Sequence, residues 1–333
     1  MNSATRVGIY AAGLAVVFGG AVGIGKAVGP FDASAETASH GTGGHGGGAT
    51  GTGHAGGHGG GAGHAPAGLQ VSEDGYTLVP SKTTVEPGER TDFRFTVNGP
   101  DGRPVTDFKP LHGKRLHLIV ARRDLSGFQH LHPEMTGGGV WSVPLTLPKP
   151  GVYRFFTDVQ PRGAQRQLTL GTDITAPGDL RPTPLPKPEP VAKVDGYEVR
   201  LTGGLTPGKS TKLTLSVSKD GKPVTDLEPY LEAYGHLVAL RQGDLAYLHV
   251  HPDGEPGDGK TKPGPDITFS AEAPSPGAYR LYLDFKHDGK VRTAEFTVHA
   301  GHSGTPAPEP EDGREPSHEP GHEPGHGDGP HTH

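Results

Sequence analysis

Hydrophobic residues in the middle of the chain alternate with other residues at every second position. The clearest runs are Phe93/Phe95/Val97, Leu116/Leu118/Val120, Trp141/Val143/Leu145/Leu147 and Leu168/Leu170. A period of two places successive hydrophobic side chains on one face of a β-strand. Pro-Gly, Asp-Gly and Gly-Gly-Gly turn signals separate the runs, and none of them has the 3.6-residue period of an amphipathic helix. The pattern therefore predicts short β-strands.

The same pattern occurs twice, because the chain contains an internal repeat. The segment Asp101–Pro110 (DGRPVTDFKP) returns as Asp220–Pro229 (DGKPVTDLEP), and FQHLHP at Phe128–Pro133 returns as YLHVHP at Tyr247–Pro252. About seven short strands in each unit is typical of an immunoglobulin-like sandwich. We therefore predict an all-β chain with two tandem immunoglobulin-like β-sandwich repeats. They occupy residues 69–174 and 191–299, and a proline-rich linker, 175–190, joins them.

The first 30 residues contain a targeting segment. Arg6 precedes an uncharged stretch, Val7–Gly25, which Lys26 closes. This stretch is nearly long enough to cross a bilayer as a helix, which favours a transmembrane anchor. The alternative is a signal helix cleaved near Ala35, because Ala33-Ser34-Ala35 fits the small-x-small cleavage pattern. Either way we expect the bulk of the chain to be extracytoplasmic, held at the cell membrane or secreted.

Two segments, one rich in glycine and histidine and the other rich in histidine, proline and glutamate, are expected to be disordered. They are a linker, residues 31–68, and a tail, residues 300–333. Neither has enough hydrophobic residues to form a core. Their histidines are His40, His45, His54, His58, His64, His302, His318, His322, His326, His331 and His333. Such segments either collect metal ions or are solvated spacers.

The overall composition excludes several classes of function. Lys plus Arg number 31 against 37 Asp plus Glu, so no basic field is available for nucleic acid. The chain has no cysteine, which excludes disulfides and thiolate ligands. Its two methionines, Met1 and Met135, do not make a thioether-rich copper(I) site.

Three histidines of each repeat occupy matching positions. They are His117, His130 and His132 in the first repeat, and His236, His249 and His251 in the second. In a strand, His-x-His presents two imidazoles on one face. If the chain turns near Asp124-Leu125, His117 comes opposite His132. Three imidazoles would then converge, and such a set suits Zn²⁺ or Cu²⁺.

The alternative is that these histidines are structural and tie down a buried loop. Asp158 and Asp284, which match across the repeats, are candidate hydrogen-bond partners in either case. A core-facing Leu131 would turn His130 and His132 outward. Ile119 shares the face of His117, however, so that face is not wholly polar.

At these residues the chain resembles a group of exported, often membrane-anchored actinobacterial proteins. The resemblance rests on Leu118–Pro133 and Gly235–Pro252 and extends over both repeats. It implies location and architecture rather than an activity. Each repeat is also similar to small extracytoplasmic sandwiches of the YtkA-like and copper-resistance type, which are associated with copper and use histidine ligands. This chain differs from them in having no methionine-rich segment.

Three classes of function remain. The first is a membrane-anchored metal-binding protein that buffers or delivers Cu²⁺ or Zn²⁺ through a histidine triad in each repeat. The second is a non-catalytic cell-surface binding or structural module for a protein or glycan partner. An enzyme is the least favoured, because no general base is placed beside the histidines. We therefore expect a metal-binding protein that is not an enzyme.

Overall fold

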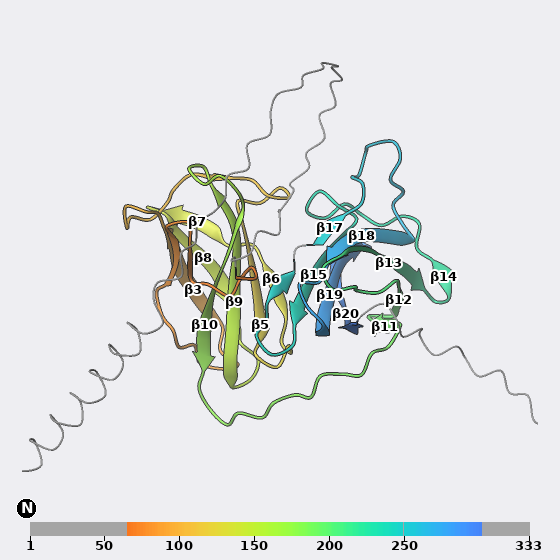
Figure 1. The fold of residues 1–333 in the computed structure, drawn as a ribbon, viewed down its shortest axis with the longest axis horizontal. Coiled ribbons are helices and arrows are strands. Elements are labelled where there is room, and N and C mark those ends of the chain that lie inside the picture. Colours follow the sequence, from red (N-terminus) through yellow and green to blue (C-terminus); the bar gives the residue numbers. More distant parts are fainter. Residues whose placement is uncertain (1–64, 249, 302–333) are drawn as a thin grey trace, which may run out of the picture. The chain divides into compact units, whose positions relative to one another are not determined.

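The computed structural model describes residues 65–248 and 250–301, apart from the side chain of His251. Every regular element in these residues is a β-strand, and the strands form two consecutive β-sandwiches (Figure 1). This confirms the predicted all-β fold of two tandem immunoglobulin-like repeats. The expected helix within residues 1–30 and nearly all of the histidine-rich linker and tail lie outside the described residues. The described part of the chain contains no helix that could cross a membrane.

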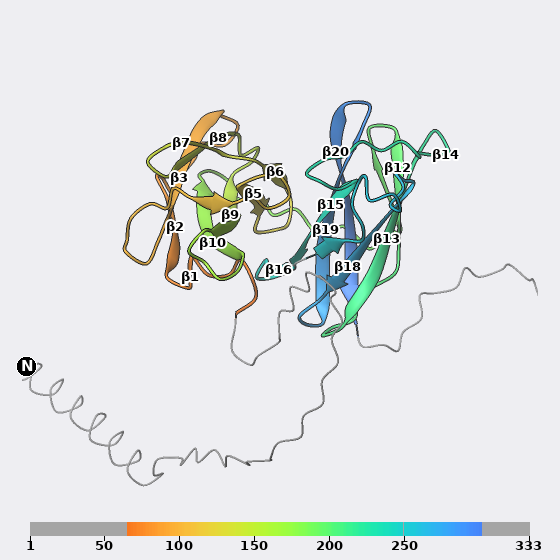
Figure 2. The ribbon, with the colours of Figure 1, turned by 90° about the horizontal axis from the view of Figure 1, so that it is seen from above.

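The first sandwich consists of two antiparallel sheets (Figures 1 and 2). One has the order β1-β2-β3-β8-β7, and the other has the order β10-β9-β5-β6, with β4 paired to β9. Its strands are β1 (Ser72–Glu73), β2 (Tyr76–Pro80), β3 (Thr91–Asn98), β4 (Phe108–Lys109), β5 (Leu116–Arg122), β6 (Gln129–Leu131), β7 (Glu134–Gly137), β8 (Val140–Leu145), β9 (Gly151–Pro161) and β10 (Leu168–Ala176).

The second sandwich repeats this plan. One sheet has the order β11-β12-β13-β18-β17, with β14 paired to β13, and the other has the order β16-β15-β19-β20. Its strands are β11 (Val191–Val194), β12 (Tyr197–Thr202), β13 (Ser210–Lys219), β14 (Lys222–Pro223), β15 (Gly235–Arg241), β16 (Tyr247–Leu248), β17 (Val250–Pro252), β18 (Asp266–Glu272), β19 (Gly277–His287) and β20 (Lys290–Ala300).

The alternating hydrophobic residues fill the space between the two sheets of each sandwich. In β3, Phe93, Phe95 and Val97 are buried. Trp141 and Val143 lie beside them on the neighbouring strand β8 and are also buried. Each such side chain removed from water stabilises the fold by roughly 1.5–3 kcal/mol. The period-two pattern therefore identified the core-facing positions correctly.

Strand β5 departs from that pattern, because both of its faces are buried. Leu116, Leu118 and Val120 belong to the core of the first sandwich, as expected. Ile119 and Ala121 point the other way and belong to a separate hydrophobic cluster. That cluster is Ile119, Ala121, Leu125 and Phe156 from the first repeat with Val238, Leu240, Leu245 and Tyr282 from the second. We call it the shared cluster.

Matching residues of the two repeats meet around the shared cluster, but with different ring geometry. Phe128 stacks on Tyr282 with ring centroids 4.0 Å apart, and Tyr247, which corresponds to Phe128, lies 5.5 Å from Phe156. All of these residues belong to the same compact unit of the chain. The outer face of β5, which carries His117, is therefore covered by the second repeat instead of by water.

Candidate metal centre

The pairing of β5 with β6 brings the histidines of the first repeat together. Leu118 pairs with Leu131 and Ile119 pairs with His130. One step further along, His117 and His132 face each other, and their ring centroids are 5.0 Å apart. The turn between the strands contains Leu125 in the left-handed conformation (φ 67°). The expectation that a turn near Asp124-Leu125 sets His117 opposite His132 is confirmed.

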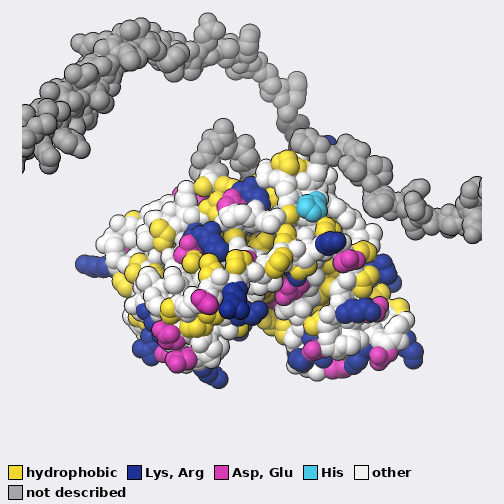
Figure 3. Space-filling model, turned by 90° about the horizontal axis from the view of Figure 1, so that it is seen from below, with side chains coloured by type: hydrophobic (Ala, Val, Ile, Leu, Met, Phe, Trp, Pro, Cys, Tyr) yellow, Lys and Arg dark blue, Asp and Glu magenta, His cyan; other side chains and the backbone are white. Residues whose placement is uncertain are grey.

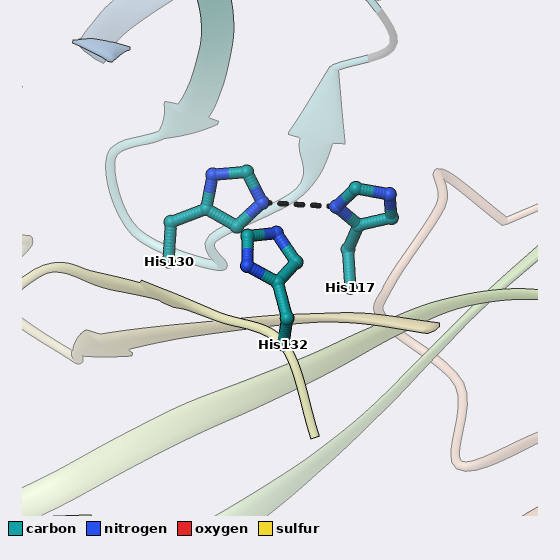
Figure 4. Close-up of side chains that lie close together, drawn as sticks. All are labelled: His117, His130 and His132. Carbon is teal, nitrogen blue, oxygen red and sulfur yellow. Dashed lines mark hydrogen bonds between the residues drawn. The ribbon is translucent and has the colours of Figure 1, made fainter. Parts of the chain in front are cut away.

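Side-chain direction follows from the alternation within β6. Leu131 packs against the core of the first sandwich, so His130 and His132 point away from that core. The rings of His117, His130 and His132 converge on one another (Figure 4). We call these three residues the triad.

The triad has the spacing of a three-imidazole metal site. One nitrogen from each ring lies within 4.8 Å of the nitrogens of the other two. The Nδ1 atom of His117 and the Nε2 atom of His130 are 3.1 Å apart. Two nitrogens bound to one tetrahedral Zn²⁺ at 2.0–2.1 Å are separated by roughly 3.4 Å, so this distance fits shared coordination. His117 is only 5% exposed and the side chain of His130 only 6%.

Hydrogen bonds fix which nitrogen of each ring carries a hydrogen. The Nε2 atom of His117 is 2.8 Å from the carbonyl oxygen of Leu111, which can only accept, so Nε2–H donates and Nδ1 keeps a lone pair. The Nδ1–H of His130 donates to Oδ2 of Asp284 at 2.7 Å, which leaves a lone pair on Nε2 in the neutral ring. Two lone pairs therefore face each other across 3.1 Å, an arrangement that a proton or a metal ion between the two nitrogens would relieve.

The third ring adds an unsatisfied nitrogen to this arrangement. The Nε2 atom of His132 is buried and has no hydrogen-bond partner within the described residues. Buried polar atoms are almost always paired, and an exception often marks a site for an ion or water. The donors present therefore fit a metal ion that prefers imidazole nitrogen.

Burial keeps two rings of the triad, His117 and His132, unprotonated at neutral pH. The pKa of His117 is lowered to about 4: burial is the largest cause, the bond to the Leu111 carbonyl opposes it, and neighbouring His130 also lowers the pKa. Burial lowers the pKa of His132 to about 3, and the nearby His130 and His117 act in the same direction. Metal binding requires neutral imidazoles, so these two rings are prepared as ligands.

The second repeat contributes to the same region of the molecule. The Nε2–H of His236 donates to the carbonyl oxygen of Leu231 at 2.8 Å, just as His117 bonds to Leu111. Burial lowers the pKa of His236 to about 4. Its ring centroid is 6.3 Å from that of His130. Of the other two predicted ligands, His249 lies outside the described residues and His251 is described only by its backbone pairing with Ser270.

Three residues near the triad were not predicted as ligands. Asp284 was expected only as a histidine partner, and it comes from the opposite repeat to the histidine that it orients. Tyr230, on the turn before β15, has its ring 6.1 Å from that of His132, and burial raises its pKa to about 12. His112 has its ring 5.3 Å from that of His236. The only sequence signal for His112 is that its counterpart in the second repeat is Leu231.

The outer surface has a different character from the triad. On the face drawn in Figure 3, lysine and arginine are interspersed with aspartate and glutamate, and hydrophobic side chains lie between them. Neither sign of charge forms a large area of its own on that face.

Several solved structures resemble the chain at low similarity. An adhesin of Escherichia coli, FdeC, is 16% identical, with 69% of this chain and 65% of that chain covered and a TM-score of 0.22. The adhesin InvE of Yersinia pseudotuberculosis is 13% identical, with 69% and 60% covered and a TM-score of 0.23. Trypsin-activated alpha-2-macroglobulin of Escherichia coli is 15% identical, with 70% and 16% covered and a TM-score of 0.24.

The chain spans less than two thirds of the length of each of these three structures. Scores of this size carry no argument about function. No curated protein matches the chain. One sequence family does match, twice, at residues 70–176 and 192–302, and its two matches cover each sandwich in turn. Because they span well over half of its length, the chain belongs to the family described as Domain of unknown function (DUF8832).

Proposed function

We propose that the protein binds a divalent transition-metal ion, Zn²⁺ or Cu²⁺, through His117, His130 and His132. The observation that carries the proposal is the pair of opposed lone pairs on His117 and His130, 3.1 Å apart. The unsatisfied nitrogen of His132 supports it independently. Three neutral imidazoles with no sulfur ligand favour Zn²⁺ or Cu²⁺ over copper(I).

In this proposal the protein buffers or delivers the ion outside the cytoplasm and is not an enzyme. The location rests on the hydrophobic stretch Val7–Gly25 and on the resemblance to exported actinobacterial proteins. The histidine-rich linker and tail would collect metal for the folded repeats. The triad His236, His249 and His251 would give the second repeat a matching site. Each of these points is an expectation from the sequence.

The structure also favours a second candidate, a cell-surface binding or structural module with structural histidines. His117 holds the turn at Leu111, His236 holds the turn at Leu231, and His130 joins the two repeats through Asp284. These three histidines thus have hydrogen-bonding roles without any metal. In this case a proton between the two facing nitrogens would join His130 and His117.

Cobalt substitution of the full-length chain distinguishes the two candidates. Co²⁺ in a tetrahedral three-imidazole site absorbs visible light much more strongly than the octahedral Co²⁺ expected on loosely bound histidines. We expect a tetrahedral band for the wild-type chain and for His299→Ala, which replaces an exposed histidine of β20. His130→Ala/His132→Ala should lose the part of the band that belongs to the first repeat. A structural role predicts no tetrahedral band in any of these proteins.

A further inference from the structure

A small cavity adjoins the triad and carries imidazoles on its wall. Its volume is about 50 Å³, and its lining includes His112, His117, His130 and His236. One water needs roughly 10–15 Å³ measured in this way, so the cavity has room for an ion with some of its water. Asp158 adds a carboxylate to the same wall. The cavity therefore offers a cation both ligands and favourable charge.

His112 and His236 are spaced like a metal-binding pair. Their ring centroids are 5.3 Å apart, and the rings within the triad are 4.8–5.3 Å apart. Two imidazoles on one tetrahedral ion have centroids roughly 5 Å apart, given a metal–nitrogen distance of 2.0–2.1 Å. His236 keeps Nδ1 for a metal because its Nε2–H is bound to a backbone carbonyl. Within the described residues the side chain of His112 has no hydrogen-bond partner.

From His112 and His236 inward to the triad, the histidine side chains become steadily less exposed to solvent. His112 is exposed on a turn, His236 is half-buried, and His117 and His130 are almost fully buried. From this pair to the triad the ring centroids are 6.2 Å apart (His112 to His117) and 6.3 Å apart (His236 to His130). These separations are too long for one shared ion but short enough for transfer between neighbouring sites. A buried metal site requires such an access path.

We infer that His112 and His236 form an entrance site that captures a divalent transition-metal ion and passes it through the cavity to the triad. This inference rests on the proposed metal binding by His117, His130 and His132. An entrance site lowers the barrier between solvent and the triad in both directions. It therefore accelerates uptake and release equally and leaves the equilibrium affinity of the triad unchanged.

Stopped-flow mixing of the full-length chain with Co²⁺ tests the inference through the growth of the tetrahedral band. The variant His112→Asn removes the outer ligand, and asparagine tolerates the left-handed backbone of this position (φ 47°). His112→Leu, which places the residue of the second repeat at this turn, is a second variant. The control is His299→Asn on β20, whose strand partner Ala278 lies six residues along β19 from Asp284.

We expect both His112 variants to slow uptake of Co²⁺ roughly tenfold, and to slow its release to a chelator by the same factor. Their dissociation constants and metal-free melting temperatures should equal those of the wild type, and His299→Asn should change none of these. Unchanged rates in both His112 variants would overturn the entrance site and leave the triad intact. A weaker affinity with unchanged uptake would also overturn it, because His112 would then be a ligand of the triad ion. A wild-type chain with no tetrahedral band would instead reject the proposed function itself.

Discussion

At the scale of single residues, the site depends on two hydrogen-bond acceptors. A carboxylate accepts the ring N–H of His130, and a backbone carbonyl accepts that of His117. Asp284 takes the Nδ1–H of His130, and Thr293 donates to the other oxygen of Asp284 at 2.6 Å. Such carboxylate–histidine contacts fix the ring and raise its strength as a ligand. Asp284 belongs to the second repeat, so a ligand of the first repeat is oriented by the other one.

The first prediction concerns this contact. Asp284→Asn should weaken metal binding by roughly 10–100-fold, because a neutral amide is a poorer acceptor for the Nδ1–H of His130. Calorimetric titration with Zn²⁺ measures the change. The control is Asp266→Asn, an exposed aspartate of β18 that accepts a hydrogen bond from Ser216. Equal affinities for Asp284→Asn and the wild type would show that Asp284 does not orient a ligand.

The second prediction concerns pH. In the folded chain the pKa values of His117 and His236 are about 4, below the unfolded value of 6.5, because the rings are buried. Between these values the unfolded state binds more protons than the folded state, so stability falls as pH decreases. Each pKa unit corresponds to about 1.4 kcal/mol for one group.

Urea unfolding of the metal-free chain measures this dependence. The free energy of unfolding should fall from pH 6.5 towards pH 4 and should be steady just above pH 7. The pKa of His132 is also lowered, to about 3. The variant His132→Gln removes this group and should therefore make the free energy of unfolding less dependent on pH. A free energy that does not change between pH 6.5 and 4.5 would mean that these rings are not buried as neutral groups.

At the scale of elements, the sequence predicted one face of β5 and could not predict the other. Alternation marked Leu116, Leu118 and Val120 as core residues, and Leu131 correctly indicated that His130 and His132 point outward. The burial of Ile119 and Ala121 depends on Val238 and Leu240, which lie well over 100 residues away in the chain. Strand periodicity contains no information about such a contact. The burial of the outer face of β5 by the second repeat was therefore not predictable from the sequence.

The third prediction tests the shared cluster. Val238→Asp places a charge where Val238 is only 4% exposed, which costs several kcal/mol. The two sandwiches have separate cores, so each should still fold. The substitution should instead weaken the association between them. Calorimetry should show one thermal transition for the wild type and two for the variant. The same change at Val79, which is 40% exposed, should leave a single transition. A single transition in Val238→Asp would show that the cluster does not couple the repeats.

At the scale of the whole molecule, the repeat in the sequence predicted two equivalent units, and the fold has them. The same symmetry predicted two equivalent triads, and only the first can be described. Around that triad the repeats are not equivalent, because His112 corresponds to Leu231 and Phe128 corresponds to Tyr247. The first triad lies beside His236 of the other repeat. That neighbourhood follows from the contact between sandwiches, which no spacing within one repeat specifies.

Metal-linked stabilisation of the full-length chain tests the central claim, that His117, His130 and His132 bind a metal ion. An ion that binds only the folded site raises the free energy of unfolding by about 2.7 kcal/mol at a hundredfold excess over its dissociation constant. Histidines that bind metal equally well in the folded and unfolded chain add nothing to this gain. The measurement therefore isolates folded sites from the histidine-rich linker and tail.

Urea unfolding with and without Zn²⁺ or Cu²⁺ gives the result directly. The wild type and His299→Ala should both gain stability with metal. His130→Ala/His132→Ala should lose the gain of the first repeat, and His249→Ala/His251→Ala should retain it. A wild-type chain whose free energy of unfolding is the same with and without either metal would contradict the claim and leave the triad a structural contact.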